Sequence, residues 1–501
     1  MNIIDRAIAA VSPIRAVRRA QARQILSYYE CAKPSQYRKG RREPGSGNTA
    51  VMRAGMSPRE QARHLEQNLD LARGILDVLV QNVVGPAGIG IEPQPRRADG
   101  SIHNELADQL LRLHRDWSRR PEVTWQHSWP CAQRLMARTW FRDGEALAQR
   151  LTGPVRLLDH GSRIPYSLEM MEPDLLPMDH NVPGDNIVMG VQRNAWGRPT
   201  RYFLYREHPG DRSHFAMNPD LKAVPADRIL HPKIVDRIGQ VRGMPIFASV
   251  ISRLEDIKDY EESERIAAKV AASMAAFIIK GSPVEHYTAT TNMEPRDIKF
   301  RPGMVFDDLL PGESVGTVDT NRPNSNLEAH RRGQIRAVAS GTRVTYSSAA
   351  KDYDGTYSAQ RQELVEGYGA YGVLASDFIA QFVQPVHEDM VAAAIASGLI
   401  RVPADVQPET IDDALYIPPQ MPWIDPDKEA KSLERLERNV HTSGPEVIRR
   451  RGQNPRDVLE QEANWRRMLK DHGLVSDSDP SHEHEEADHA EEIGARTRRR
   501  A

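Results

Sequence analysis

One long amphipathic segment constrains the fold of this 501-residue chain more than any other. Residues 245–279 place apolar side chains at a spacing of three and four residues, from Val250 through Ile257 to Phe277. This period predicts a single α-helix. At about 1.5 Å per residue the helix would extend for about 50 Å, which is longer than most helices of globular proteins. The segment therefore predicts an element that packs against other helices over much of its length.

The second half of this segment repeats small side chains. Adjacent alanines recur every four residues, and such a repeat lets a neighbouring helix approach closely. The pattern favours a packed bundle or a ring of subunits. The predicted helix-packing positions are Ala267, Ala268, Ala271, Ala272 and Ala275.

The rest of the chain alternates helical and strand-like patterns. Apolar periodicity predicts one helix that starts at a Ser57 cap and ends before Gly85, and further helices at 104–120, 130–142, 326–341, 428–440 and 454–472. A long helix over 358–398 contains Pro385, which predicts a kink. Residues 145–235 read as β-rich, with NAWGRP as a hairpin loop. The sequence predicts that four tryptophans are core residues: Trp117, Trp125, Trp129 and Trp140. The fold class is α+β, predominantly helical.

Composition limits the functions that this chain can have. Its 67 Lys and Arg residues balance 69 Asp and Glu residues, which argues against a surface devoted to nucleic acid. Only 39% of the residues are hydrophobic, so a large solvated surface or an elongated subunit is expected. Two cysteines make no disulfide framework, and no apolar run reaches the ~20 residues that span a bilayer. With no secretory signal in view, an intracellular location is expected.

Both ends of the chain have biased composition. The first 53 residues are strongly basic and are interpreted either as a solvated arm or as an arm that docks on an acidic partner or nucleic acid. The last 26 residues are almost free of apolar side chains and are expected to be disordered. His482, His484 and His489 lie there among carboxylates, and a solvated acidic tail is favoured over a metal site.

Catalytic motifs are scarce. No Gly-Lys pair exists, which excludes the P-loop pattern, and His387-Glu388 lacks the second histidine of a zinc-protease helix. Ser348 and Lys351 match the SxxK pattern, but its SDN and KTG partner motifs are missing. The carboxylate pairs Asp307-Asp308 and Asp412-Asp413 have no aligned histidine or third acid. We expect no enzymatic activity, cofactor or metal.

Six stretches, in order, resemble the lambda-type portal proteins of tailed phages. The resemblance covers nearly all of residues 25–472 and departs at the termini. The stretches are YYECAKPSQYRKGRR (28–42), LVQNVVGPAGIGIEPQ (79–94), RTWFRDGEALAQ (138–149), RIGQVRGMPIFASVISRLEDIKDYEESERIAAKVAA (237–272), YSSAAKDYDGTYSAQRQELVE (346–366) and MPWIDPDKEAKSLERLERN (421–439).

The resemblance implies a subunit built from wing, stem, clip and crown. On that basis the chain would divide into a basic N-terminal arm (1–53), the wing (54–244), a stem helix (245–280), the clip (281–325), a second stem helix (326–341), the tunnel loop (342–357), the long kinked helix (358–398), the crown (399–475) and a disordered tail (476–501).

The resemblance also implies that the tunnel loop projects into a channel for double-stranded DNA, which it contacts without reading sequence. In this loop Arg343 and Lys351 are balanced by Asp352 and Asp354, so the duplex would be held only weakly. The candidate channel residues are Arg343, Tyr346, Ser347, Ser348, Lys351, Asp352 and Tyr353.

The implied assembly is a ring of about twelve copies at a unique capsid vertex of the virion, assembled in the host cytoplasm. Its implied partners are the large terminase subunit, the major capsid and scaffold proteins and a head–tail connector protein, with no membrane. Two other classes fit the residues themselves. One is a cytosolic enzyme with dispersed catalytic residues, and the other is a monomeric nucleic-acid scaffold with its basic arm at 1–53. The size of the assembled particle separates all three.

Overall fold

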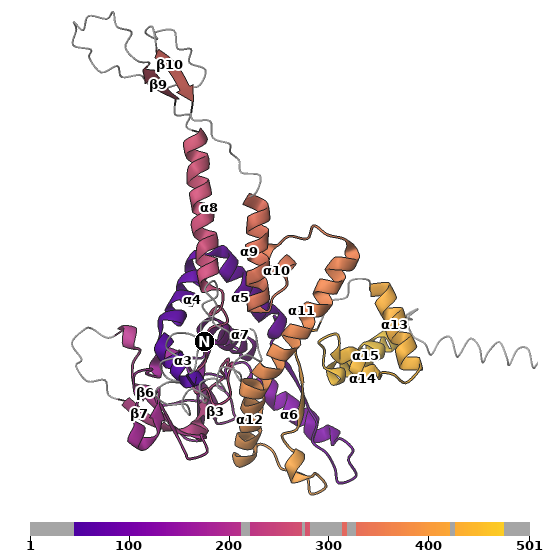
Figure 1. Ribbon diagram of the computed structural model, residues 1–501. Helices are drawn as coiled ribbons and strands as arrows, with labels where there is room; N and C mark the ends of the chain where they lie inside the picture. Colours follow the sequence, from indigo (N-terminus) through magenta and orange to yellow (C-terminus); the bar gives the residue numbers. More distant parts are fainter. Residues whose placement is uncertain are drawn as a thin grey trace, which may run out of the picture. The chain divides into compact units, whose positions relative to one another are not determined.

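The computed structural model describes residues 45–211, 221–272, 276–280, 313–317, 327–420 and 426–474 (Figure 1). The chain divides into two units. The smaller unit, in its described part, consists of residues 45–54 and 236–240, and the larger unit holds the remaining residues. The expectations for the basic arm over 1–44, for most of the clip and for the acidic tail lie outside the described residues.

The smaller unit is a short helix joined to a distant turn. Helix α3 (Gly47–Ala54) begins where Arg237 donates a hydrogen bond to the carbonyl oxygen of Gly45 at 2.8 Å. The side chain of Asn48 donates to the carbonyl oxygen of Gly239 at 2.9 Å. A side chain at Gly47 would meet Arg237 at 3.1 Å, so a glycine suits this contact.

Helices at the start of the larger unit form the centre of its core. They are α4 (Ser57–Asn68), α5 (Asp70–Val83), α6 (Asn104–Trp117) and α7 (Trp129–Asp143). The single helix predicted from Ser57 is wrong, because Leu69 has an extended backbone and separates α4 from α5. Met56, not Ser57, is the N-cap of α4, and the Ser57 hydroxyl accepts a hydrogen bond from Gln61 at 2.7 Å.

Aromatic side chains fill this core. Trp117 stacks on Tyr166 with ring centroids 5.8 Å apart, and Trp129 lies 5.2 Å from Trp117. Trp117, Trp129 and Trp140 are all buried, as predicted. The prediction for Trp125 is wrong: its ring is 41% exposed, and the guanidinium of Arg120 covers it at 5.0 Å.

Short antiparallel strands follow, as the sequence predicts for 145–235. One sheet has the order β3-β2-β8 and another the order β4-β5-β6-β7. Leu147 pairs with Met171 in the first sheet, and the NAWGRP turn joins β5 to β6. The strands are β2 (Leu147–Thr152), β3 (Tyr166–Met171), β4 (Ile187–Val188), β5 (Val191–Arg193), β6 (Pro199–Tyr205), β7 (Leu221–Pro225) and β8 (Ile229–Leu230).

The long helix predicted over 245–279 is shorter in the structure. Helix α8 spans Ile251–Ala272, and the residues that should complete it form strand β9 (Ala276–Lys280), which pairs with β10 (Glu313–Thr317). Phe277, Ile278 and Ile279 favour a strand, because aromatic and β-branched residues suit a pleated surface. The helix predicted at 326–341 is confirmed as α9 (Leu327–Thr342).

The second long helix is confirmed, with its irregularity placed before the proline. Helix α11 (Tyr357–Phe378) passes through a π-helical turn (Ile379–Val383) into α12 (Gln384–Ala396), and the direction changes there (Figure 1). Pro385 lacks an N–H and would clash with the preceding turn, so the wider π-turn accommodates it. Phe378 and Phe382 then pack on Trp140 and Trp129, with centroid distances of 5.6 and 5.5 Å.

The last described elements return to the start of the unit. Strand β1 (Gly90–Pro93) pairs with β11 (Ala414–Ile417), and helices α13 (Pro426–Arg438), α14 (Gly444–Arg449) and α15 (Pro455–Asp471) follow. Arg449 binds Glu92 at 2.8 Å, and Arg456 binds Asp108 at 3.0 Å. Across the described ranges, every helix is too short or too polar to traverse a bilayer.

Candidate functional site

The segment between α9 and α11 is the predicted tunnel loop, and it is not a simple loop. It contains helix α10 (Tyr346–Ala350), whose N-cap Thr345 accepts a hydrogen bond from the backbone N–H of Ser348. Thr356 caps α11 in the same way through the N–H of Ala359. The sequence carries these threonine caps, but five residues are too few to show a helical period. The segment is thus a short helix between two capped ends.

The two predicted cationic residues flank α10. Arg343 follows α9 with φ 60°, and Lys351 is the C-cap of α10 with φ 53°. Both lie in the left-handed region, which costs a residue other than glycine about 1–2 kcal/mol. Both side chains are exposed. The backbone therefore holds two cations at the ends of α10 against a local conformational cost, which marks this segment as a functional candidate.

The predicted polar residues of the segment bind one another. Tyr346 donates to Asp352 at 2.8 Å, and this hydrogen bond lowers the pKa of Asp352. Ser347 binds Glu363 of α11 through its backbone N–H at 2.9 Å and through its hydroxyl at 2.5 Å. The hydroxyl of Ser348 accepts from Thr345 at 2.7 Å. These bonds fix α10 against α11.

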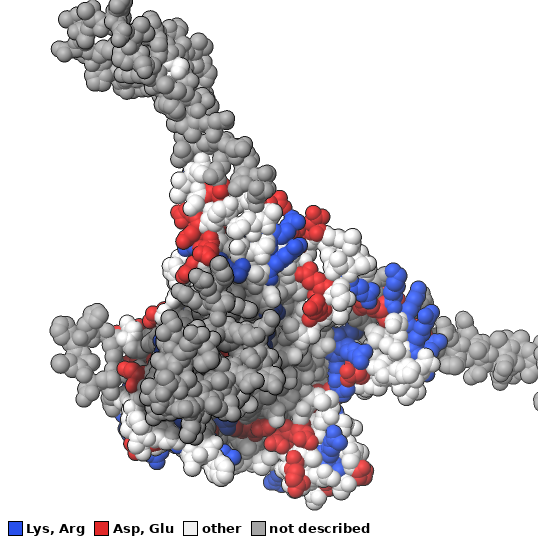
Figure 2. Space-filling model, in the orientation of Figure 1, with Lys and Arg blue, Asp and Glu red and all other residues white. Residues whose placement is uncertain are grey.

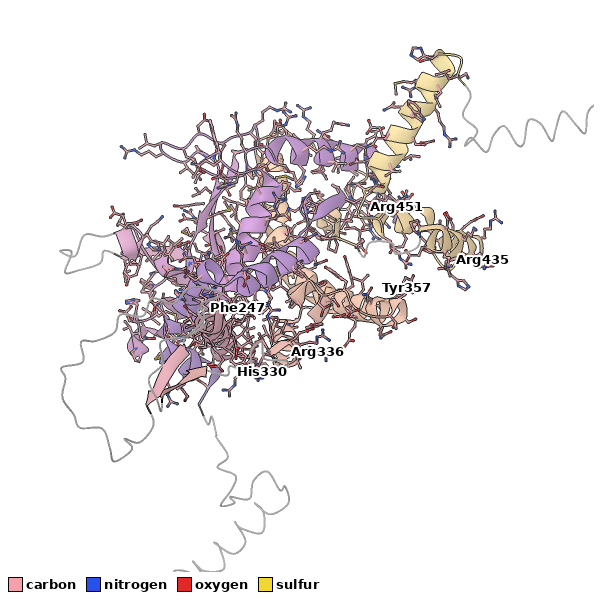
Figure 3. All side chains as sticks on the ribbon, turned by 90° about the horizontal axis from the view of Figure 1, so that it is seen from above. Phe247, His330, Arg336, Tyr357, Arg435 and Arg451 are labelled. Carbon is pink, nitrogen blue, oxygen red and sulfur yellow. The ribbon has the colours of Figure 1, made fainter. Side chains whose placement is uncertain are left out.

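A hollow of about 200 Å³ lies beside α10. Tyr353 and Tyr357, which are 61% and 55% exposed, stand at it with Arg361 of α11. Figure 3 shows Tyr357 on the outer part of α11, with Arg336 on α9. Of the seven predicted channel residues, Ser347, Ser348 and Tyr353 line this hollow. The channel role of all seven stays a prediction.

The predicted packing alanines are described only in part. Ala267 is half-buried and Ala268 is exposed on α8. Ala271 and Ala272 belong to the last turn of α8, and their side chains lie outside the part that the structure describes. Ala275 also lies outside the described residues. The proposed close helix contacts at these positions stay predictions.

Residues 17–373 match the family described as phage portal protein, lambda family. The match covers well over half of the 501 residues. The chain belongs to this family. The family resemblance noted from six sequence stretches is thereby confirmed.

A curated relative agrees with the portal family. The chain is 24% identical over 450 residues to a probable portal protein of the Halomonas phage phiHAP-1, covering 87% of this chain and 85% of the relative. Two solved structures also resemble it. A chain from the neck of an empty gene transfer agent particle is 11% identical with a TM-score of 0.46, covering 87% of this chain and 100% of that one. A chain from the neck of a native particle is 12% identical with a TM-score of 0.39, covering 80% and 92%.

Sequence reasoning missed a buried charged cluster in this portal-family chain. Glu145 is fully buried and binds Arg242 at 2.5 Å, Arg59 at 2.6 Å and His231 at 3.0 Å. Burial alone would raise the pKa of Glu145, but Arg242, Arg59 and the hydrogen bond with His231 lower it well below its usual range. Burial lowers the pKa of His231 to about 4, so its imidazole is neutral at neutral pH. We call these four residues the Glu145 cluster.

The Glu145 cluster fixes the chain just before α8. Arg242 also donates to the carbonyl oxygens of Leu176 and Met189, both at 3.0 Å. Gly144 has φ +84°, and a side chain there would lie 2.2 Å from the carbonyl carbon of Met244. Only a glycine lets the two backbones approach this closely. The portal-family subunit therefore enters α8 from a rigid, charge-paired base.

A second group of titratable residues, two acids and a histidine, lies in the larger unit. One ligand atom each of Glu172, Asp174 and His208 lies within 4.8 Å of the others, an arrangement that could hold a cation. The guanidinium of Arg63 lies 2.5 Å from Asp174 and 2.8 Å from Asp143. Arg63 thus already supplies the positive charge that a bound cation would bring.

Proposed function

We propose that this portal-family chain assembles as a ring of about twelve copies at one capsid vertex and forms the channel for packaging and ejection of double-stranded DNA. The observation that carries the channel assignment is the placement of Arg343 and Lys351 at the two ends of α10, exposed and in left-handed conformations. Membership of the portal family supports the assignment. The ring also docks the large terminase subunit, the major capsid and scaffold proteins and the head–tail connector protein.

The charge balance of residues 342–357 suits a duplex that must slide. Every phosphate neutralised by Lys or Arg releases counterions and strengthens binding, so a strongly basic channel would hold DNA in place. Here Asp352 and Asp354 offset Arg343 and Lys351, and the intervening residues are small or polar. Contacts with phosphates position a duplex without reading its bases. The segment would therefore retain packaged DNA by transient contacts.

We assign the subunit regions on the same basis. Helices α8 and α9 form the stem, residues 281–325 the clip, α11 with α12 the long helix that radiates into the wing, and residues 399–475 the crown. The wing then consists of residues 54–244, which include the aromatic core. The assembled ring belongs to the virion after its assembly in the host cytoplasm.

The test is a double substitution, Arg343→Ala with Lys351→Ala, in a phage whose portal gene is supplied in trans. We expect normal rings by negative-stain imaging and a reduced yield of DNA-filled heads, because the transient phosphate contacts are lost. Arg228 and Arg401 are exposed arginines elsewhere in the larger unit, so the pair Arg228→Ala and Arg401→Ala is the matched control. Unchanged DNA retention in the Arg343 and Lys351 variant would overturn the channel assignment.

A further inference from the structure

Helices α8 and α9 lie side by side, and their shared contact fixes which side of each helix faces away from the other. Arg331 binds Glu261 at 2.5 Å, and Arg253 donates to Gln334 at 2.6 Å. The rings of Tyr260 and His330 meet edge to face, with centroids 5.0 Å apart. Side chains half a turn away from these contacts are therefore directed away from the partner helix.

The side of α8 directed away from α9 carries a line of acids. Glu255, Asp259 and Glu262 are followed by Ile266, and spacings of four, three and four residues place them on one face. All four are exposed, and Ile266 is 52% exposed. Within the described ranges Glu255 and Asp259 form no ion pair, while Glu262 lies 3.7 Å from Arg265. We call Glu255, Asp259 and Glu262 the acidic flank.

The side of α9 directed away from α8 carries arginines. Arg332 and Arg336 are one turn apart, and we call them the basic flank. The guanidinium of Arg336 is exposed and lies 5.1 Å from the centre of the Tyr346 ring, a contact that orients the charge without neutralising it. Arg332 is shared between Glu328 at 2.7 Å and Asp352 at 3.8 Å. Figure 3 shows Arg336 and His330 on different sides of α9.

The outward side of α8 therefore presents three acids. The outward side of α9 presents Arg336, together with Arg332, which is shared between Glu328 and Asp352. Figure 2 shows red side chains along α8 and blue side chains along α9. Like charges one turn apart on a helix repel, so Glu255 and Asp259, which form no ion pair among the described residues, destabilise a lone subunit slightly. A second copy presents the matching charge on its other flank. A contact between two different surfaces of identical subunits repeats head to tail and closes into a ring when the rotation allows.

We propose that the acidic flank of one copy binds the basic flank of the next copy. The inference rests on the proposed function, because it names the contact that builds the proposed ring. Opposite charges steer the approach of the copies and set their order, and Ile266 adds an apolar contact beside them. If the basic flank contacted DNA instead, the acidic flank would have no role. Only the pairing of copies therefore predicts that changes to the acidic flank of α8 impair ring formation.

Two charge-reversed variants test the pairing. The first carries Glu255→Lys, Asp259→Lys and Glu262→Lys, and the second carries Arg332→Glu and Arg336→Glu. Each variant alone has the same charge on both flanks, so we expect at least a tenfold loss of ring by mass photometry at low salt. Mixed in equal amounts they should form rings again, because every junction then joins opposite charges. A single chain that carries all five changes should form rings by itself.

The matched control reverses three exposed acids elsewhere, Glu105→Lys, Asp227→Lys and Glu409→Lys, and should form rings as the unmodified chain does. Circular dichroism must show that each variant is folded. Rings from either variant alone, or no rings from the folded mixture, would overturn the flank pairing while leaving the proposed function intact. Normal rings with DNA loss confined to the Arg332 and Arg336 variant would favour the DNA reading instead. If the unmodified chain forms no ring, the proposed function fails together with this inference.

Discussion

Charged side chains have opposite surroundings in two regions of this chain. In the Glu145 cluster the charged side chains are buried and paired over distances of 2.5–2.6 Å. On the acidic and basic flanks of α8 and α9 they are exposed, apart from the half-buried Arg332. Glu255, Asp259 and Arg336 form no ion pair among the described residues. A buried pair becomes costly when one partner is removed, whereas an exposed charge contributes little to folding. The comparison assigns the cluster to the stability of the subunit and the flanks to its association.

Removing one partner from the Glu145 cluster should have the largest effect. Arg242→Met deletes the guanidinium that binds Glu145 and three backbone carbonyl oxygens, and it leaves a carboxylate buried without its main partner. We expect a loss of about 3–5 kcal/mol in the free energy of unfolding, measured with urea. Arg253→Met, which removes an exposed arginine from α8, serves as the control. Equal stability of the two variants would contradict the structural role of the cluster.

A substitution that disturbs the backbone contact beside the Glu145 cluster should have the second-largest effect on the free energy of unfolding. Gly144→Ala places a methyl group 2.2 Å from the carbonyl carbon of Met244 at a φ of +84°. The conformation and the overlap together should cost about 2–4 kcal/mol. Gly153→Ala is the matched control, since Gly153 has φ +74° but nothing within 4 Å. It should cost only about 1–2 kcal/mol, as conformation alone does. Thermal unfolding at fixed protein concentration measures the difference.

The third-largest effect concerns two buried histidines and depends on pH. Burial lowers the pKa of His114 to about 4 and that of His387 to about 3, against about 6.5 in an unfolded chain. Between pH 6.5 and 4 the unfolded chain binds protons that the folded chain does not, so stability is present above pH 6.5 and is lost as the pH falls. Each histidine should remove about 1 kcal/mol per pH unit in this window.

The variant His387→Leu isolates one of these histidines. Its free energy of unfolding should fall less steeply with decreasing pH than that of the unmodified chain. His64→Leu is the control, because His64 is exposed on α4 and, among the described residues, its ring bonds only Asn68 of the same helix. The same pH slope in His387→Leu and in the unmodified chain would show that His387 is not held neutral in the folded chain.

Exposed charges on the flanks should have the smallest effect on folding. Glu255→Gln removes one carboxylate that forms no ion pair in the described part of the larger unit. Its unfolding curve should match that of the unmodified chain within error, because the side chain is solvated in both states. A clear loss of stability would show that Glu255 contributes to folding as the Glu145 cluster does, and it would contradict the assignment of the flanks to association.

The sequence predicted much of the fold, because helical period is a local signal. The apolar spacing located α6, α7, α9 and α15 within a few residues. It failed beyond α8, because apolar residues such as Phe277 can continue a helical stripe or enter a strand, and pairing with β10 decided the outcome. It also missed α10, whose five residues complete little more than one turn.

Only part of the candidate site was predicted from the sequence. Arg343 and Lys351 could be proposed because the family resemblance places the tunnel loop over residues 342–357. Their left-handed backbone could not be predicted, because residues of these types usually avoid that conformation. The Glu145 cluster was invisible, since Arg59 is 86 residues away from Glu145 and Arg242 is 97 residues away. The flanks of α8 and α9 became visible only when their contact showed which sides face away from each other.

Closed assembly of the unmodified chain is required both by the proposed channel and by the pairing of the flanks. Mass photometry of the purified protein at low salt measures it. We predict one dominant species with about twelve times the 56.4 kDa subunit mass, and its dissociation as salt rises, because the flanks attract through exposed charges. A protein that stays monomeric or dimeric under these conditions would contradict the account.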